Sequence, residues 1–272
     1  MTGAPFIGLY PFQWIALVTA ALALLLAGEA LVGHYRKGFG LRAQYMPLVS
    51  GGVLVVSAVA AAAAPGAAWA NAALSAAGWL ALATGAVGFA FHHYYGIAGK
   101  PGGYGWLLHH LMYGAPQLAP LAFAHVGLLA LVTARGLMGA GAVAGFGMRA
   151  ALFGFVAVAL AGAILQAGIL HYRGAFNNPA MYAPLAAPPL AVCASVWAAL
   201  APGRAASLAL AALLWLTFLT GFAGWGMHLR GFDRQMGGVY VTLFNLLEGP
   251  APFAPALFAG FAAVGLVTVH LL

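Results

Sequence analysis

Long apolar runs follow one another along almost the whole chain, and charged side chains rarely interrupt them. Apolar residues fill 64% of the 272 positions, whereas Asp, Glu, Lys and Arg together fill only 5%. A soluble domain carries roughly a quarter charged residues. A run of about 20 apolar residues is long enough to cross a bilayer as a helix. The sequence therefore predicts an all-α integral membrane protein, and a soluble fold is excluded.

Two stretches of the sequence each occur twice. Segments 93–123 and 228–258 share ten of 31 residues, including a Gly-Gly pair and the glycine of a Gly/Pro helix break. Segments 34–48 and 171–185 share eight of 15 residues, among them His, Arg, Tyr and Pro. Apolar helices match one another by chance, but loops with these residue types do so far less. The sequence therefore predicts an internal duplication.

We expect four spans in each repeat. Their approximate ranges are 12–32, 48–64, 70–91, a run ending near 134, 150–170, 185–200, 205–227 and 253 to the end. A short apolar piece precedes the last span of each repeat, at 106–113 and 239–247, and we expect an interfacial or re-entrant half-helix there. The predicted fold is a duplicated 4+4 bundle of eight transmembrane helices, with parallel repeats at 1–137 and 138–272.

An even number of spans per repeat inserts both repeats the same way up, so the histidine-bearing helix ends fall on one side. Seven of the ten basic residues lie on that side: Arg36, Lys37, Arg42, Lys100, Arg173, Arg230 and Arg234. The positive-inside rule then puts this side in the cytoplasm and both termini outside, in a membrane of the bacterial inner type. Orientation in the lipid bilayer explains the net charge of +7, and nucleic acid is excluded as a partner.

Histidines stand where spans meet loops and on the first half-helix. Neutral imidazole is the commonest metal ligand, so these residues are the candidate ligands of haem b or of a non-haem metal: His34, His92, His93, His109, His110, His171 and His228. Three arginines, each two residues beyond an edge histidine, are candidates for binding a propionate or another anion: Arg36, Arg173 and Arg230. The competing interpretation is that both residue types only anchor the helices to lipid headgroups.

Four further polar residues lie inside spans or at a helix break: Glu29, His125, Gln166 and Glu248. Glu29 is the only carboxylate inside a predicted span, and Gln166 stands at the equivalent place in the second repeat. A charge in the bilayer is costly, so Glu29 is expected to pair with a basic group, bind a metal or be protonated. His125 is explained equally well by a bond to a backbone carbonyl. Glu248 lies at a Gly-Pro break, a feature that marks binding sites in repeat-built transporters.

Missing motifs exclude several chemistries. The sequence contains no CxxCH motif for covalent haem, and neither a P-loop nor an HExxH zinc motif. The single cysteine, Cys193, cannot form an internal disulfide or a cysteine-based zinc or iron–sulfur site.

Three functions remain open on the sequence. The leading expectation is an electron-transfer membrane subunit, linked to a quinone, that binds haem or another metal and relies on a redox partner subunit. The alternatives are a small-molecule or ion transporter or channel, and a membrane-embedded metal-dependent enzyme acting on a lipid or isoprenoid; whether the chain is an enzyme is left open. We expect the site between the repeats at the cytoplasmic end, lined by His34, His93, His171 and His228.

Overall fold

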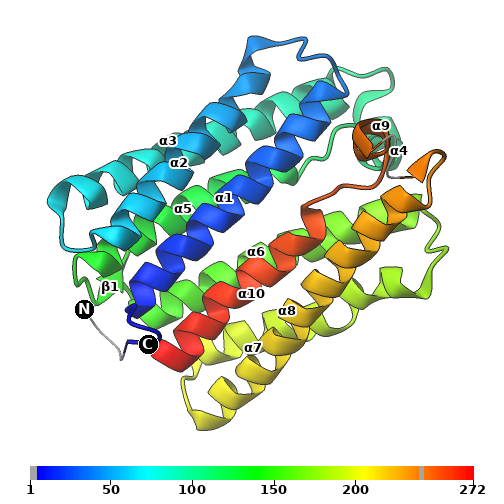
Figure 1. Cartoon of the computed structure of the whole chain (residues 1–272). Helices are drawn as coiled ribbons and strands as arrows, with labels where there is room; N and C mark the ends of the chain where they lie inside the picture. Colours follow the sequence, from blue (N-terminus) through cyan, green and yellow to red (C-terminus); the bar gives the residue numbers. More distant parts are fainter. Residues whose placement is uncertain (1–4, 239–241) are drawn as a thin grey trace.

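The computed structural model describes residues 5–238 and 242–272, and within them the chain is almost entirely helical (Figure 1). The first half holds α1 (Pro11–Tyr35), α2 (Met46–Ala63), α3 (Ala68–His93), α4 (Leu107–Tyr113) and α5 (Ala119–Leu137). The second half holds α6 (Met148–Arg173), α7 (Ala187–Leu200), α8 (Arg204–Asp233), α9 (Thr242–Glu248) and α10 (Ala254–Leu271).

Short elements join these helices. Helices of the 3-10 type lie before α2, α4 and α7, at Arg42–Tyr45, Gly103–Trp106 and Pro179–Leu185, and a π-helix at Tyr94–Ala98 continues α3. A small hairpin of β1 (Ala142–Val143) and β2 (Phe146–Gly147), which the sequence does not predict, links α5 to α6.

Seven helices of the described part are long and apolar enough to cross a membrane. The helix α10 is shorter, with an apolar stretch from Ala254 to His270. Large apolar side chains such as Leu24, Trp79 and Leu219 project from the outside of the bundle, where a bilayer would surround them with lipid instead of water. The chain is therefore an all-helical membrane protein, as the sequence predicts.

The long helices form an inner group of four and an outer group of four. The inner helices are α1, α5, α6 and α10, and each contacts helices from both halves of the chain. Outside them, α2 packs on α1 and α3 on α5, while α7 packs on α6 and α8 on α10. The start of α1, the end of α10 and the hairpin lie at one end of the bundle, whereas α4 and α9 lie at the other end (Figure 1).

The core is built from apolar side chains of the inner helices and from the faces of the outer helices that they cover. The largest fully buried side chains are Ile15, Leu22, Leu54, Leu74, Val126, Leu129, Leu152, Val156, Leu160, Leu210, Leu214 and Phe261. Because lipid is as apolar as these side chains, close packing rather than exclusion of water holds such helices together.

Glycines allow the closest helix contacts. A Cβ atom on Gly85 of α3 would lie 2.5 Å from the carbonyl oxygen of Pro120 and closer still to the amide nitrogen of Ala124. On Gly221 of α8 it would lie 3.0 Å from the carbonyl oxygen of Pro255 and 2.6 Å from the amide nitrogen of Ala259. Only a residue without a side chain fits at either position, because the neighbouring atoms belong to the backbone.

Some helix ends differ from the prediction. The third span continues through His93 into the π-helix, and α8 extends to Asp233, well beyond the predicted end at Met227. The prediction ended both spans where polar residues begin, but no glycine–proline signal stops either helix there. The predicted second half-helix at 239–247 is described only as α9, and its first residues, 239–241, lie outside the described part.

We predict that Gly85→Ala lowers the thermal stability of the purified protein, because the added methyl group meets backbone that cannot move aside. Overpacking of this kind costs about 1–3 kcal/mol. Gly162→Ala in α6 is the matched control, since a Cβ atom added there would meet no neighbouring atom within 4 Å, and alanine favours a helix. Melting curves in detergent measure both variants. Equal melting temperatures for Gly85→Ala and wild type would contradict this account of the α3–α5 contact.

Candidate functional site

Four histidines at helix ends form two pairs, one in each half. The ring centres of His34 (α1) and His92 (α3) lie 6.3 Å apart, with 69° between the ring planes. The ring centres of His171 (α6) and His228 (α8) lie 6.5 Å apart, with 61° between the planes. The pairs form within the halves, whereas the sequence led us to expect one site between them.

All four histidines are held in the same way by a backbone carbonyl. Their Nδ1 atoms lie 2.8 Å from Gln44 O (His34), 2.9 Å from Pro116 O (His92), 2.7 Å from Met181 O (His171) and 2.7 Å from Ala251 O (His228). A carbonyl oxygen can only accept, so Nδ1 carries the proton in each ring. In the neutral imidazole, Nε2 then keeps its lone pair, and it makes no hydrogen bond to another described residue.

A strained aromatic residue stands beside one histidine of each pair. Phe39 and Phe176 both adopt φ of 47°, in the left-handed region that a bulky residue seldom adopts. Phe39 stacks on Tyr45 and presents an edge to His34, and Phe176 does the same between Tyr182 and His171. Strain of this kind persists only where the surrounding structure imposes it, and it gathers at functional sites. The sequence carried a signal here, because both aromatic pairs recur in the repeated loops.

The π-helix changes which histidine joins the first pair. Matching the sequence segments sets His93 opposite His228, but His92 makes the contacts that correspond to those of His228. The π-helix accommodates one extra residue in the first half, directly after these histidines. His93 instead lies with Nε2 2.6 Å from the hydroxyl oxygen of Tyr104. The sequence analysis missed Tyr104, which has no counterpart among the repeated residues.

Arg36, directly after α1, and Arg173, the last residue of α6, contact the other half of the chain. Arg36 donates from Nη2 to Gly249 O at 2.7 Å and to Leu246 O at 3.3 Å, at the end of α9. Arg173 lies over the ring of Tyr113 in α4, with 5.7 Å from Cζ to the ring centre. Arg36 and Arg173 thus attach to the short helices, while Arg230 is exposed on α8.

Glu29 and Gln166 make equivalent hydrogen bonds between the halves. Oε2 of Glu29 in α1 accepts from the backbone N–H of Phe253, just before α10, at 2.8 Å. Oε1 of Gln166 in α6 accepts from the N–H of Leu118, just before α5, at 3.2 Å. Each side chain therefore satisfies a donor at a break in the chain, where the bilayer interior offers no water.

The histidines of α4 have separate roles. His110 is buried, and its Nε2 lies 3.2 Å from Pro101 O. Asn245 of α9, also buried, donates its two N–H groups to Gly238 O at 2.8 Å and to Phe232 O at 3.2 Å. Both residues fasten a short helix to the loop before it, so His110 acts as a brace. His109 is exposed, with its ring centre 5.0 Å from that of Tyr113.

The remaining candidates lie apart from the paired histidines. Nε2 of His125 lies 2.9 Å from Phe155 O, and its ring stacks on Phe155, so it ties α5 to α6. Glu248 ends α9, but its side chain lies outside the described part. Within the described residues no three or more His, Cys, Asp or Glu side chains gather as a metal site. Two-histidine pairs are thus the largest groups of candidate ligands in that part of the chain.

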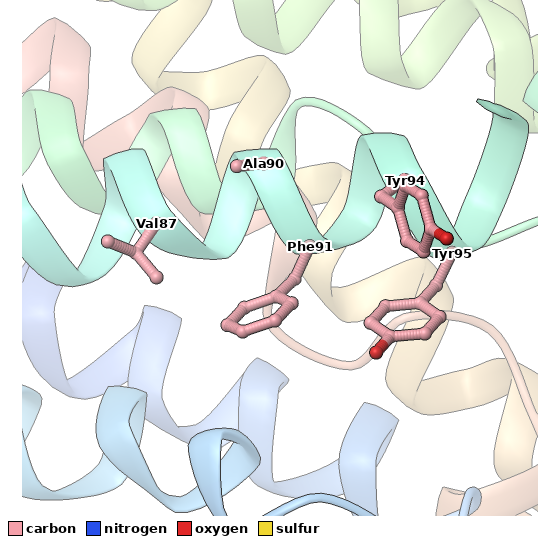
Figure 2. A pocket seen from close by; sticks show the side chains of 5 residues that line it. All are labelled: Val87, Ala90, Phe91, Tyr94 and Tyr95. Carbon is pink, nitrogen blue, oxygen red and sulfur yellow. The ribbon is translucent and has the colours of Figure 1, made fainter. Parts of the chain in front are cut away.

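A shallow, open groove of about 290 Å³ lies on the outer surface of α3 and the π-helix, and its lining residues are all exposed. It is lined by Val87, Ala90, Phe91, Tyr94 and Tyr95, and Figure 2 shows Val87, Phe91 and Tyr95 projecting from the same side of the helix. Its lining belongs to the same stretch of chain as His92. Apolar side chains and tyrosine rings suit an apolar ring or chain that enters from the bilayer.

We predict that His110→Asn keeps the stability of the protein, whereas His110→Ala loses about 1–3 kcal/mol. Asparagine supplies the N–H donor that Asn245 supplies in the other half, but alanine leaves the Pro101 carbonyl unpaired. Thermal unfolding in detergent measures the difference. If His110→Asn and His110→Ala are equally unstable, an imidazole is required there and the role as a brace is wrong.

We compared the chain with known protein families, proteins and structures. No protein-family model, curated protein or solved structure matches the chain. Its function must therefore be inferred from its own residues, chiefly from the two pairs of histidines at one end of the bundle.

Proposed function

We propose that the chain is a duplicated membrane protein of eight spans, with α10 as the eighth and repeats at 1–137 and 138–272. The proposal is supported by contacts that recur in both halves. The packing order α1–α2–α3–α5 matches α6–α7–α8–α10. The loop glycines at 102 and 103 have positive φ, as do those at 237 and 238.

We propose further that each histidine pair binds a metal centre, either haem iron or a non-haem transition-metal ion. One observation carries this proposal: all four rings donate Nδ1–H to a backbone carbonyl. That bond fixes the tautomer and the ring orientation of metal-binding histidines and leaves Nε2 as the ligand atom. Four interfacial histidines that only met lipid headgroups would have no need of four matching internal bonds.

The spacing of the rings fits two imidazoles that share one metal. Metal–imidazole bonds of about 2.0–2.1 Å keep the ring centres of two ligands of one ion within roughly 6–7 Å of each other. The observed distances are 6.3 and 6.5 Å. His34 with His92, and His171 with His228, would hold haem iron or a non-haem ion, since imidazole binds Fe, Cu and Zn.

We propose that these centres serve electron transfer in a membrane subunit. The groove of Phe91, Tyr94 and Tyr95 lies on the same stretch of chain as His92, and a quinone ring from the bilayer fits such a lining. The described residues form helices and short connections only, so a redox partner subunit would supply the substrate chemistry. By the positive-inside rule the histidine end is cytoplasmic and both termini are outside.

The metal proposal predicts which variants lose the bound metal. The double variants His34→Ala/His92→Ala and His171→Ala/His228→Ala should each lose about half of the metal or haem of the purified protein, because each pair is a separate site. His270→Ala, near the other end of α10, should lose none. Absorption spectra and elemental analysis measure this, and a Soret band distinguishes haem from a bare ion.

Retention of full metal content by both double variants would overturn the proposal, as would a wild-type protein that binds neither haem nor Fe, Cu or Zn after reconstitution. Folding of each variant is checked by its elution volume and melting temperature. A variant that folds normally and lacks metal supports direct ligation.

A transporter is the second candidate, favoured by the breaks between α4 and α5 and between α9 and α10. Both breaks are bonded to the opposite half through Glu29 and Gln166, and broken helices at matching places of two repeats mark transport sites. Uptake of ions or metals into proteoliposomes of a metal-free, colourless protein would favour this function.

The eight-span topology predicts the accessibility of single cysteines placed on a Cys193→Ser background. Cysteines at Gly38, Gly99 and Gly174 should react with a membrane-impermeant reagent from one side only, since all three follow histidine-bearing helix ends. Cysteines at Gly66 and Gly139 should react only from the opposite side. Labelling of intact cells and of inverted vesicles measures both sets. A mixture of sides within either set would exclude this topology.

A further inference from the structure

Glu29 has an ionisable carboxyl group at a position where the fold requires only a hydrogen-bond acceptor. Its Oε2 accepts the N–H of Phe253 at the start of α10. In the other half, Gln166 accepts the N–H of Leu118 with a neutral amide oxygen. The fold at these breaks therefore needs a hydrogen-bond acceptor, but it does not need a carboxyl group. A carboxyl group inside a transmembrane helix is costly and is by default a sign of function.

Opposing influences act on this carboxyl group. Burial in an apolar span favours its neutral form, whereas the hydrogen bond from the Phe253 N–H favours its charged form. A carboxyl group can bind and release a proton, whereas an amide cannot. Gln166 stands seven residues before Arg173, as Glu29 stands seven residues before Arg36, but its amide has no proton to exchange.

Few other charged groups face Glu29 from the elements that pack on α1. The helix α2 contains no titratable residue, α10 contains only His270 at its far end, and α5 contains His125 and Arg135. Glu248 of α9 has a side chain outside the described part. Arg36, directly after α1, is thus the main charged neighbour among the described residues.

We propose that Glu29 is a proton-binding site of the membrane domain that exchanges its proton with water at the histidine end. Glu29 lies five residues before His34, about 7.5 Å along the helix axis. It is half-buried, and fewer than two helical turns separate it from the loop after α1. The second half, with Gln166, lacks the site, and the two halves therefore differ in proton binding.

The test is pH-difference infrared spectroscopy on metal-free protein in detergent or lipid. The chain has only three acidic side chains, so a carboxyl C=O band is readily assigned. Acidification should produce a band of a protonated carboxyl group shielded from water in wild type, and Glu29→Gln should abolish it. Asp233→Asn is the control that should keep it. Gln166→Glu should add a second band.

Stability measurements separate proton binding from a structural role. Glu29→Gln should melt like wild type, because it recreates the amide acceptor of the other half, whereas Glu29→Ala should melt lower. An infrared difference spectrum unchanged in Glu29→Gln overturns the proposal, and so does a Glu29→Gln protein as unstable as Glu29→Ala. Because the experiment needs no metal, its outcome is independent of the metal-binding proposal.

Discussion

An interrupted helix inside a bilayer must find hydrogen-bond partners within the protein, because the hydrocarbon offers none. The two breaks in this chain find theirs in the opposite half. Glu29 of α1 accepts from the residue before α10, and Gln166 of α6 accepts from the residue before α5. Arg36 adds bonds to the carbonyl end of α9. Each half therefore holds the short helix of the other, and the histidine end depends on both.

The same breaks orient the candidate metal ligands. His92 and His228 bond to carbonyls of Pro116 and Ala251, in the segments that join the short helices to α5 and α10. Glu29 and Gln166 accept backbone N–H groups from the same segments. These segments thus donate N–H groups to one set of side chains and accept N–H groups from the imidazoles. The helix breaks leave backbone carbonyls free to accept from these rings. In an unbroken helix, the same carbonyls would accept from N–H groups of the helix itself.

The membrane class, most helix ranges and the location of the histidines at helix ends could be predicted from apolar run lengths and punctuation by glycine and proline. The pairing of His34 with His92 could not be predicted, because it depends on one extra residue in the first half. Matching the repeated segments aligned His93, and not His92, with His228. The role of His110 could not be predicted either, since the equivalent bond to the preceding loop in the other half is made by a different residue, Asn245. Two different residues can make equivalent hydrogen bonds, and a comparison of sequence identity does not detect that equivalence.

The π-helix also bears on the history of the chain. If the halves descend from one ancestral gene, as proposed, the residue that this helix accommodates was gained by the first half or lost by the second after the two copies were joined. An added residue turns the following backbone of a helix by about 100°, and a π-helix confines that disturbance to one turn. His93 was thus free to form a contact of its own, with Tyr104, while the neighbouring His34–His92 pair kept the geometry of the other pair. Under that proposal, the extra residue disturbs one turn of one helix, and the packing order of the long helices stays the same in both halves.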